Sequence, residues 1–281
     1  MREFVEDAYQ LVLRRSPDPD ALDWAVRELE RGSLSPAGLI AELVASAEFA
    51  RLRALEDAVA LARRAREEQI RPRELTAPPE TEERLIEIPW VLARYAGESR
   101  VLDVGFANAD AEYLAALVDA APDRVVGVDP VEADREGVRG VVGDMRALPF
   151  EDGAFDVVLC VSTIEHVGRD NRVYGSEDER DEAGIPQALR ELRRVGGRIL
   201  LTVPTGAKED HGWFVQLDAD TWRRLFADAS LGIVEEEVYE LTPEGWRTAD
   251  GDAVDARYGE RGPAASAVFC VELRALKEPS V

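Results

Sequence analysis

Hydrophobic residues recur at helical spacing over the first 70 residues of the chain. Two of the predicted helices begin at an Asp-Pro or Ser-Pro pair, residues 18–19 and 35–36, and Gly32 is a typical helix end. The pattern therefore predicts a small all-α domain over residues 1–70. Its three apolar stripes consist of Phe4, Ala8, Leu11 and Val12; Leu22, Ala25, Val26 and Leu29; and Leu39, Leu43, Ala47 and Leu52.

The pattern changes after residue 70. Residues 71–83 are polar and proline-bearing, which predicts a linker, and a helix over 85–95 should bend near Pro89. From residue 100 onward, apolar strands alternate with helices, which indicates a mostly parallel sheet in an α/β domain over residues 84–281. The predicted strands are 100–105, 124–129, 138–142, 155–161, 197–203, 231–239 and 266–275.

Charge and composition narrow the class of protein. The formal net charge of −23 repels phosphate backbones and anionic membranes, so we expect no nucleic-acid partner. No apolar run is long enough to cross a bilayer, and the N-terminus lacks the apolar core of a signal peptide, so we expect no membrane insertion. Cys160 and Cys270 lie in predicted strands without neighbouring histidines. We therefore expect no metal site, a reducing compartment and a cytoplasmic location for this acidic protein.

Parallel α/β sheets bind ligands beyond the carboxyl ends of their strands, and four such positions carry suitable residues. The first is the turn from Asp103 to Asn108, where Gly105 lets the backbone approach a ligand closely. Asp129 ends the next strand, and an acidic residue about 20 residues beyond the glycine turn can accept hydrogen bonds from both ribose hydroxyl groups of a nucleotide. NAD-dependent enzymes share this feature. The third and fourth positions lie within 143–150 and 155–167.

In their order, these motifs resemble those of class I S-adenosylmethionine (SAM)-dependent methyltransferases over residues 85–240. The resemblance implies a Rossmann-like, seven-stranded, mostly parallel sheet with SAM as the cofactor. It implies that Asp129 binds the ribose, that Asp144 receives the adenine amino group and that Met145 packs on the purine. Ala107 and Ala109 stand where the family commonly has glycines. The implied cofactor-binding residues are Asp103, Gly105, Phe106, Ala107, Asn108, Asp129, Pro130, Asp144, Met145, Val161 and Ser162.

Some roles stay open at this stage. Asp103 either orders the glycine turn or contacts the cofactor. Transfer of a methyl group to a hydroxyl needs a base, and the candidates are His166, Glu165 and His211. His166 follows the fourth strand and either acts as the base or shapes the pocket. His211 lies in a loop that should cover the pocket, and the acidic insert at 168–184 is either a solvated loop or a lid over a polar acceptor.

Two further resemblances concern the acceptor. Residues 9–49 resemble a small helical module of unassigned function that occurs in bacterial surface-layer proteins and beside glycan-modifying enzymes, which implies a protein partner for this domain. Short segments such as EHVG at 165–168 and LTVPTG at 201–206 are similar to bacterial methyltransferases encoded with surface-polysaccharide genes. These resemblances imply O-methylation of a glycan or another small polar acceptor. Trp213, Phe214 and Trp246 would then stack on a sugar ring or pack in the core.

Two alternatives remain. The missing glycines and the lack of an obvious base are compatible with a non-catalytic SAM-fold scaffold or binding protein. A nicotinamide-dependent oxidoreductase would have a G-x-G-x-x-G turn, whereas this chain has GFANAD at 105–110.

Overall fold

The computed structural model describes residues 1–176 and 180–276, so part of the insert at 168–184 lies outside the described residues. The chain forms two compact units, Met1–Asp57 and Ala58–Val281. The division falls inside helix α4 (Ala47–Glu67) and therefore lies before residue 70, where we had predicted the helical domain to end.

The first unit is helical, as predicted. It contains α1 (Arg2–Leu13), α2 (Pro19–Arg31), α3 (Pro36–Val44) and the beginning of α4. Two helices begin at the predicted Asp18 and Ser35 positions, and Gly32 ends α2 with a φ of 74°. Its core consists of Val5, Ala8, Tyr9, Val12, Leu13, Leu22, Ala25, Leu29, Leu39 and Leu43.

The apolar stripe predicted over residues 39–52 belongs to two helices, α3 and α4. The chain leaves the helical path after Val44, and the Ser46 hydroxyl accepts a hydrogen bond from the Phe49 N–H at 3.1 Å. This hydrogen bond is a typical start of a new helix. The stripe gave no sign of the break because its apolar spacing continues across it.

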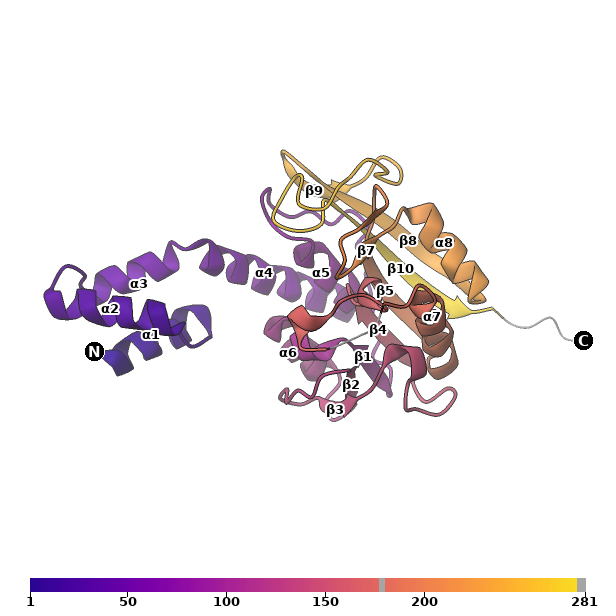
Figure 1. The fold of residues 1–281 in the computed structure, drawn as a ribbon, viewed down its shortest axis with the longest axis horizontal. Helices are drawn as coiled ribbons and strands as arrows, with labels where there is room; N and C mark the ends of the chain where they lie inside the picture. Colours follow the sequence, from indigo (N-terminus) through magenta and orange to yellow (C-terminus); the bar gives the residue numbers. More distant parts are fainter. Residues whose placement is uncertain (177–179, 277–281) are drawn as a thin grey trace, which may run out of the picture. The chain divides into compact units, whose positions relative to one another are not determined.

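The second unit is built on an eight-stranded sheet with the order β3-β2-β1-β4-β5-β10-β8-β9 (Figure 1). Strands β1 to β5 pair in parallel, and β10, β8 and β9 add antiparallel strands. The strands are β1 (Val101–Val104), β2 (Val125–Asp129), β3 (Arg139–Val142), β4 (Val157–Val161), β5 (Arg198–Pro204), β8 (Leu231–Thr242), β9 (Gly245–Thr248) and β10 (Ala267–Ala275). A separate hairpin joins β6 (Glu209–Asp210) to β7 (Val215–Gln216).

The α/β class and the mostly parallel pairing are confirmed, but the predicted number of seven strands was wrong. All seven predicted strands exist, and β9 is the eighth. β9 has only four residues, Gly-Trp-Arg-Thr, so it carries no alternation of apolar and polar residues that could reveal it. It forms because a tight turn folds it back on β8, where Thr242 pairs with Gly245.

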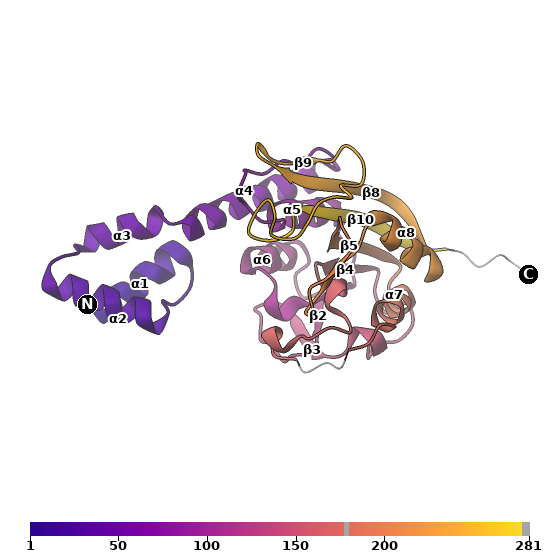
Figure 2. The same cartoon turned by 45° about the horizontal axis from the view of Figure 1, so that its top comes forward.

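Helices cover both faces of the sheet. α5 (Arg84–Arg94) and α6 (Ala111–Ala120) lie on one side, whereas α7 (Gly184–Val195) and α8 (Ala219–Asp228) lie on the other (Figures 1 and 2). α5 contains the expected Pro89 and packs on β4, β5 and β10. This two-sided cover explains why β1, β2 and β5 are buried along their whole length and β4 up to its last residue, Val161.

The segment that we predicted as a linker, 71–83, packs against the second unit. Ala77 and Trp246 exchange backbone hydrogen bonds of 3.4 and 2.8 Å, which adds the segment to the edge strand β9. Leu75 is buried, and Arg71 forms ion pairs of 3.1 Å with Glu235 and Glu272. Composition alone missed this because an exposed sheet edge offers backbone partners to any extended segment, whatever its side chains.

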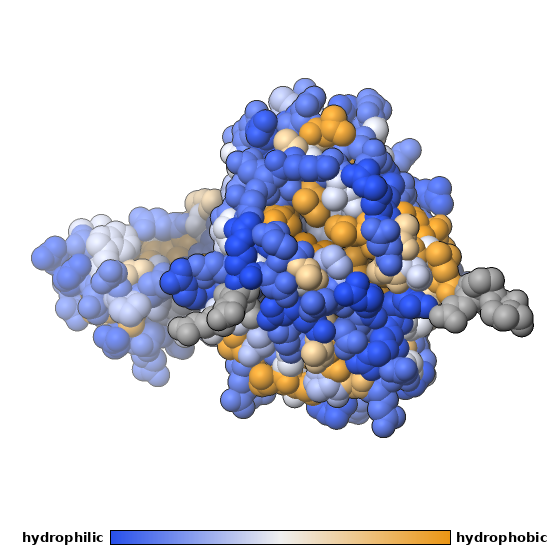
Figure 3. Space-filling view, turned by 45° about the vertical axis from the view of Figure 1, so that its right-hand side comes forward, coloured by the Kyte–Doolittle hydropathy of each residue, from blue (hydrophilic) through white to orange (hydrophobic). Residues whose placement is uncertain are grey.

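The surface agrees with the composition. Hydrophilic side chains cover most of the face drawn in Figure 3, and hydrophobic ones form separate patches between them. Within the described part of the chain, no helix combines the length and the apolar character needed to cross a lipid bilayer.

Candidate active site

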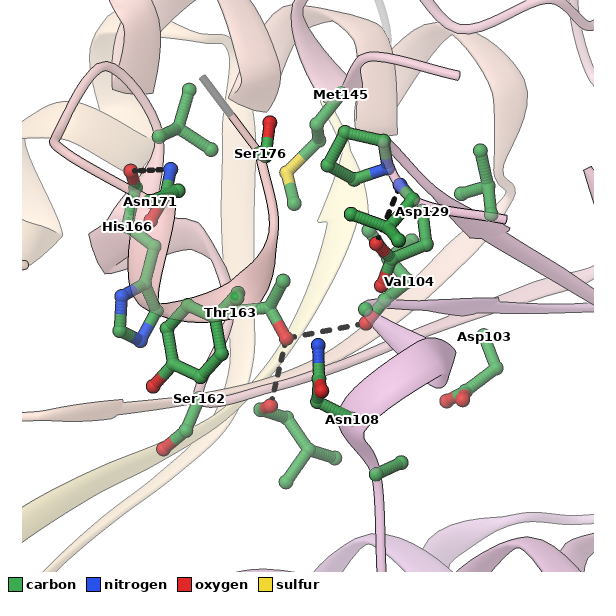
Figure 4. Close-up of a pocket in the computed structure, with 18 of the residues that line it drawn as sticks. Asp103, Val104, Asn108, Asp129, Met145, Ser162, Thr163, His166, Asn171 and Ser176 are labelled. Carbon is green, nitrogen blue, oxygen red and sulfur yellow. Dashed lines mark hydrogen bonds between the residues drawn. The ribbon is translucent and has the colours of Figure 1, made fainter. Parts of the chain in front are cut away.

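A cavity opens at the carboxyl ends of the parallel strands (Figure 4). Its walls come from the turn after β1, the end of β2, the residues after β3 and the end of β4, and α5 adds Arg84 and Ile88. The predicted residues that line it are Asp103, Gly105, Asn108, Asp129, Pro130, Asp144, Met145, Val161, Ser162 and His166. The structure thus brings together side chains from four separate motifs.

Gly105 is the point at which the cavity needs a glycine. Its φ is 87°, and a Cβ atom there would lie 2.5 Å from the Thr163 hydroxyl oxygen. That oxygen lies 2.8 Å from the Val161 carbonyl and 3.2 Å from the Val104 carbonyl, so Thr163 links the ends of β4 and β1. Thr163 was missed in the sequence because its contact with Gly105 depends on the pairing of two distant strands.

The two alanines in the glycine turn cause no backbone strain. Ala107 lies within a single 3₁₀ turn (Phe106–Asn108), and Ala109 has a φ of −69°. Neither position has the positive φ that favours glycine. The departure from the family's glycine pattern is therefore compatible with an ordered turn.

Phe106 and Ala107, which we predicted to contact the cofactor, do not line the cavity. The Phe106 ring is buried against Gly127 and Gly140 in β2 and β3, where a Cβ atom would collide with it. The Ala107 N–H donates a hydrogen bond of 3.2 Å to Asp129 Oδ2. Both residues therefore order the turn through contacts with β2 and β3, and neither forms part of the cavity wall. The sequence could not show this, since only the strand register brings the two glycines under the ring.

Asp129 is held with its carboxylate at the cavity wall. Oδ2 accepts the hydrogen bond from Ala107, and Oδ1 accepts one of 3.0 Å from the Val131 N–H. Burial raises the pKa of this carboxyl group above its usual value, although both backbone hydrogen bonds oppose the rise. Each carboxylate oxygen keeps a further lone pair, so the group can accept hydrogen bonds from two hydroxyls.

Asp103 was left open between two roles, and its surroundings favour ordering of the fold. The Tyr113 hydroxyl in α6 donates a hydrogen bond of 2.6 Å to Asp103 Oδ1, which ties this helix to the end of β1. Burial raises the pKa of Asp103 to about 7; the Tyr113 hydrogen bond opposes this shift and the charge of Asp129 adds to it. Figure 4 shows Asp103 beyond the turn that carries Asn108.

Asp144 lines the cavity in an ion pair. Arg146 donates to its carboxylate from Nη2 at 2.6 Å and from the backbone N–H at 2.7 Å. Burial opposes ionisation, but these contacts outweigh it and lower the pKa of Asp144. The carboxylate is therefore ionised and fixed beside the buried Met145, in the place where the resemblance implies an adenine.

A network from α5 reaches the cavity and was missed in the sequence. The Ser162 hydroxyl donates a hydrogen bond of 2.6 Å to Glu87 Oε1, and Arg84 Nη1 lies 2.5 Å from Glu87 Oε2. Ser162 has a φ of 40°, a strained value for a non-glycine residue. Glu87 is fully buried, so it holds both Ser162 and Arg84 in fixed positions at the wall. Seventy-five residues separate Ser162 from Glu87, and no local motif connects them.

His166 presents one ring nitrogen without a proton. Its Nδ1 lies 2.9 Å from the Trp213 carbonyl oxygen, which can only accept a hydrogen bond, so Nδ1 carries the proton. Burial lowers the pKa of His166 to about 4, although the hydrogen bond to Trp213 opposes this, and the ring is neutral at pH 7. Nε2 therefore carries a free lone pair. In Figure 4, His166 lies across the cavity from Asp129, with Thr163 between them.

The other two predicted catalytic residues do not line this cavity. Glu165 is 2% exposed, and its Oε2 has no hydrogen-bond partner among the described residues. Burial raises its pKa to about 8. His211 stacks on Phe214 with ring centroids 4.4 Å apart and lines a neighbouring cavity. Among the three candidates, only His166 faces the place where the strand ends meet.

The side chains at this cavity fit SAM. Gly105 leaves room for close backbone approach, Asp129 offers fixed acceptors to ribose hydroxyls, and Met145 offers an apolar surface to a purine. The ionised Asp144 also suits a ligand that carries positive charge.

Comparisons with known proteins agree with this reading. A family model described as a methyltransferase domain matches residues 102–201. A curated protein of Encephalitozoon cuniculi (strain GB-M1), named "Putative methyltransferase", is 34% identical over 113 residues, which are 39% of this chain and 47% of that protein. The chain thus spans about half the length of the curated relative that it matches.

Solved structures show weaker similarity. The YcgJ protein of Bacillus subtilis is 17% identical, with a TM-score of 0.43 over 65% of this chain and 94% of that chain. The 1,6-didemethyltoxoflavin-N1-methyltransferase of Burkholderia thailandensis, solved with S-adenosylhomocysteine (SAH), is 15% identical, with a TM-score of 0.43 over 97% of this chain and 91% of that chain. Similarities this low assign no acceptor. Over residues 102–201 the chain is similar to methyltransferase domains, and this match supports SAM as the cofactor of the cavity.

Proposed function

We propose that the whole chain is an active methyltransferase that transfers the methyl group of SAM to a hydroxyl group of a glycan or another small polar acceptor. The observation that carries this proposal is the fixed tautomer of His166. Its Nδ1–H is held by the Trp213 carbonyl, so Nε2 has no proton; Nε2 lies 3.9 Å from Glu165 Oε1, and His166 lines the cavity that carries Asp129 and Asp144.

The chain's own part in the reaction is to bind, orient and remove a proton. Asp129 would hold the ribose hydroxyls, and Asp144 with Met145 would hold the adenine. When bound, SAM supplies a methyl group on a positively charged sulfur. His166 Nε2 would accept the proton of the acceptor hydroxyl as the acceptor oxygen takes the methyl carbon and the carbon–sulfur bond breaks to leave neutral SAH. The Trp213 carbonyl then stabilises the charged imidazolium through the Nδ1 hydrogen bond.

One observation favours the second candidate, a non-catalytic SAM-binding protein. Burial lowers the pKa of His166 to about 4, so its imidazole is a weak base in this structure. General bases act best when their pKa lies near the working pH. A scaffold would still bind SAM through Asp129 and Asp144 but would transfer no methyl group.

Methyl transfer from radiolabelled SAM separates the two candidates. The acceptor panel contains free sugars, nucleotide sugars, oligosaccharides, proteins and lipids. We expect label in the carbohydrate fractions, and His166→Gln should lower kcat by about 10²–10⁴-fold with little change in SAM affinity. Asp156→Asn, beside the start of β4 and in the wall of neither cavity, is the control. Label confined to proteins or lipids would contradict the glycan acceptor, and SAM binding without transfer to any acceptor would favour the scaffold.

We further propose a protein partner for the first unit and a cytoplasmic location for the chain. The first unit leaves large apolar side chains exposed, and one of them, Trp24, belongs to the segment that resembles an association module. Exposed aromatic residues of this kind are common at protein interfaces. The exposed large apolar residues of this unit are Met1, Leu11, Trp24, Ile40 and Val44.

A further inference from the structure

A second cavity lies beside the cofactor cavity, and Tyr174 lines both. The wall of the second cavity is formed by residues after β4 and by the loop between β6 and β7. Its lining residues are Asp170, Arg172, Val173, Tyr174, His211, Gly212 and Trp213. We refer to it as the outer cavity. A molecule bound there would be next to the proposed base.

Aromatic rings connect His166 to the outer cavity. The His166 ring centroid lies 5.2 Å from both the Tyr174 and the Trp213 centroids, and these two lie 6.0 Å apart. Tyr174 and Trp213 are only half-buried. Half-exposed rings grouped beside a reactive nitrogen form a ready surface for the apolar face of a ligand.

Contacts within the β6–β7 loop and with His166 hold this aromatic surface in place. His211 stacks on the buried Phe214, and the His211 N–H donates a hydrogen bond of 3.0 Å to the Phe214 carbonyl across the β6–β7 loop. The Trp213 carbonyl is fixed by the hydrogen bond with His166. The loop is therefore ordered before any ligand binds, which lowers the entropy cost of binding.

A polar pair stands at the rim of the rings. Arg172 Nε donates a hydrogen bond of 2.8 Å to Asp170 Oδ1, and this contact lowers the pKa of Asp170 to about 2, so the carboxylate is ionised. The pair offers both donors and acceptors at the wall of the outer cavity.

We propose that the outer cavity is the acceptor subsite and that it binds a neutral pyranose ring. A pyranose has an apolar face of C–H groups that can lie on Trp213 and Tyr174, and a rim of hydroxyls that can bond to Asp170 and Arg172. One hydroxyl then points past Tyr174 toward His166 Nε2. This inference rests on the proposed methyl transfer to a hydroxyl and names the part of the chain that selects the acceptor.

The test uses the full chain saturated with SAH and neutral methyl pyranosides of glucose, galactose and mannose as probes. Binding is measured by saturation-transfer NMR and titration calorimetry. Trp213→Ala should weaken the binding of at least one pyranoside by 10-fold or more, and Trp213→Phe should restore most of it because a ring is retained. Val173→Ala, which shortens an exposed lining side chain without a ring, is the control. SAH affinity should stay within 2-fold of wild type in all three variants.

The outcomes separate this inference from the proposed function. Binding of none of the three pyranosides, or equal binding by Trp213→Ala and wild type, would overturn the inference. Trp213-dependent binding of a simple phenol or an alkylamine in place of the pyranosides would overturn the ligand class. Pyranoside binding without methyl transfer would leave the subsite intact and contradict the proposed function. For active protein, the inference also requires that Trp213→Ala raises the acceptor KM far more than it lowers kcat.

Discussion

Buried carboxyl groups occur in two regions of the second unit, and their surroundings differ. Around the cofactor cavity, Asp103 receives a hydrogen bond from the neutral Tyr113 hydroxyl, and Glu165 Oε2 has no hydrogen-bond partner among the described residues. Burial raises the pKa of Asp103 to about 7 and that of Glu165 to about 8. These acids are costly to ionise where they lie.

On the antiparallel side of the sheet, buried carboxylates meet arginines. Arg94 Nη2 lies 2.7 Å from Glu235 Oε1, and Arg198 Nη2 lies 2.8 Å from Glu272 Oε2. Burial opposes ionisation of Glu235 and Glu272, but the arginines outweigh it and lower both pKa values. In the same network burial still raises the pKa of Glu237, so the compensation is not complete.

At the cofactor cavity Glu87 is paired with Arg84, but Asp103 and Glu165 have no arginine partner among the described residues. On the antiparallel side, Glu235 and Glu272 both have one. Paired charges hold α5 and the segment at 71–73 against β8 and β10. Buried acids without a cationic partner reduce stability, and proteins keep such groups mainly where a ligand or a reaction uses them. The strained φ of Ser162 and the positive φ of Gly105 lie in that same region.

The largest expected effect is the loss of an arginine from the paired network. Arg94→Met would leave Glu235 and Glu237 buried without this cation and the Trp90 ring without its stacked guanidinium. We expect the free energy of unfolding to fall by about 3–5 kcal/mol, measured by urea denaturation at pH 7. Arg73→Met removes a weaker, exposed pair with the same Glu235 and should change it by less than about 0.5 kcal/mol. If Arg94→Met and Arg73→Met lowered the free energy of unfolding equally, the stabilising role of the buried ion pairs would be refuted.

The second-largest expected effect concerns the glycine turn at the cofactor cavity. In Gly105→Ala, the new Cβ would lie 2.5 Å from the Thr163 hydroxyl, so the turn must shift. We expect SAH affinity to fall by about 100-fold, or about 2.7 kcal/mol, in calorimetry. Gly97→Ala is the control, because Gly97 has nearly the same φ of 86° but nothing within 4 Å of the added Cβ. Gly97→Ala should lower the stability of the fold but leave SAH affinity unchanged. An equal loss of SAH affinity in both variants would contradict a role for the Gly105 turn in cofactor binding.

The smallest effect tests the unpaired acids through pH. The pKa of Glu165 is raised in the folded chain, so the stability that its protonated form contributes is complete below about pH 4.5 and is lost as the pH rises through about 8. Glu165→Gln should therefore raise Tm at pH 8 by roughly 2–4 °C for each 1 kcal/mol gained, and by much less at pH 5.

The pH dependence of stability expected from Glu272 has the opposite sign to that expected from Glu165. Its pKa is lowered in the folded chain, so its stabilising effect is present above its usual pKa and is lost as the pH falls through its folded-state pKa. Glu272→Gln should lower Tm at pH 8. If both glutamine variants shifted Tm in the same direction at pH 8, the comparison between the two regions would fail.

Local patterns predicted the parallel strands and the strand-end motifs, because each depends on a short run of apolar residues and the turn after it. They did not predict β9, which has no apolar alternation, or the packing of 71–83, which depends on an available sheet edge. At the site, Asp129 and His166 could be placed from their distance to a strand end. The roles of Phe106, Thr163 and Glu87 depend on residues brought together by strand register and by α5, so no local pattern could reveal them.

Calorimetric titration of SAH into the wild-type chain and into Asp129→Asn tests the central claim most directly. The Asp129 carboxylate is fixed by two backbone N–H groups at the cavity, and loss of a ligand hydrogen bond to a charged group costs about 1.5–3 kcal/mol. We expect wild type to bind SAH and Asp129→Asn to bind it at least about 10-fold more weakly. Asp156→Asn, at the other end of β4, should bind it as wild type does. No binding by wild type at millimolar SAH, or equal affinity of wild type and Asp129→Asn, would contradict the assignment of this cavity to the cofactor.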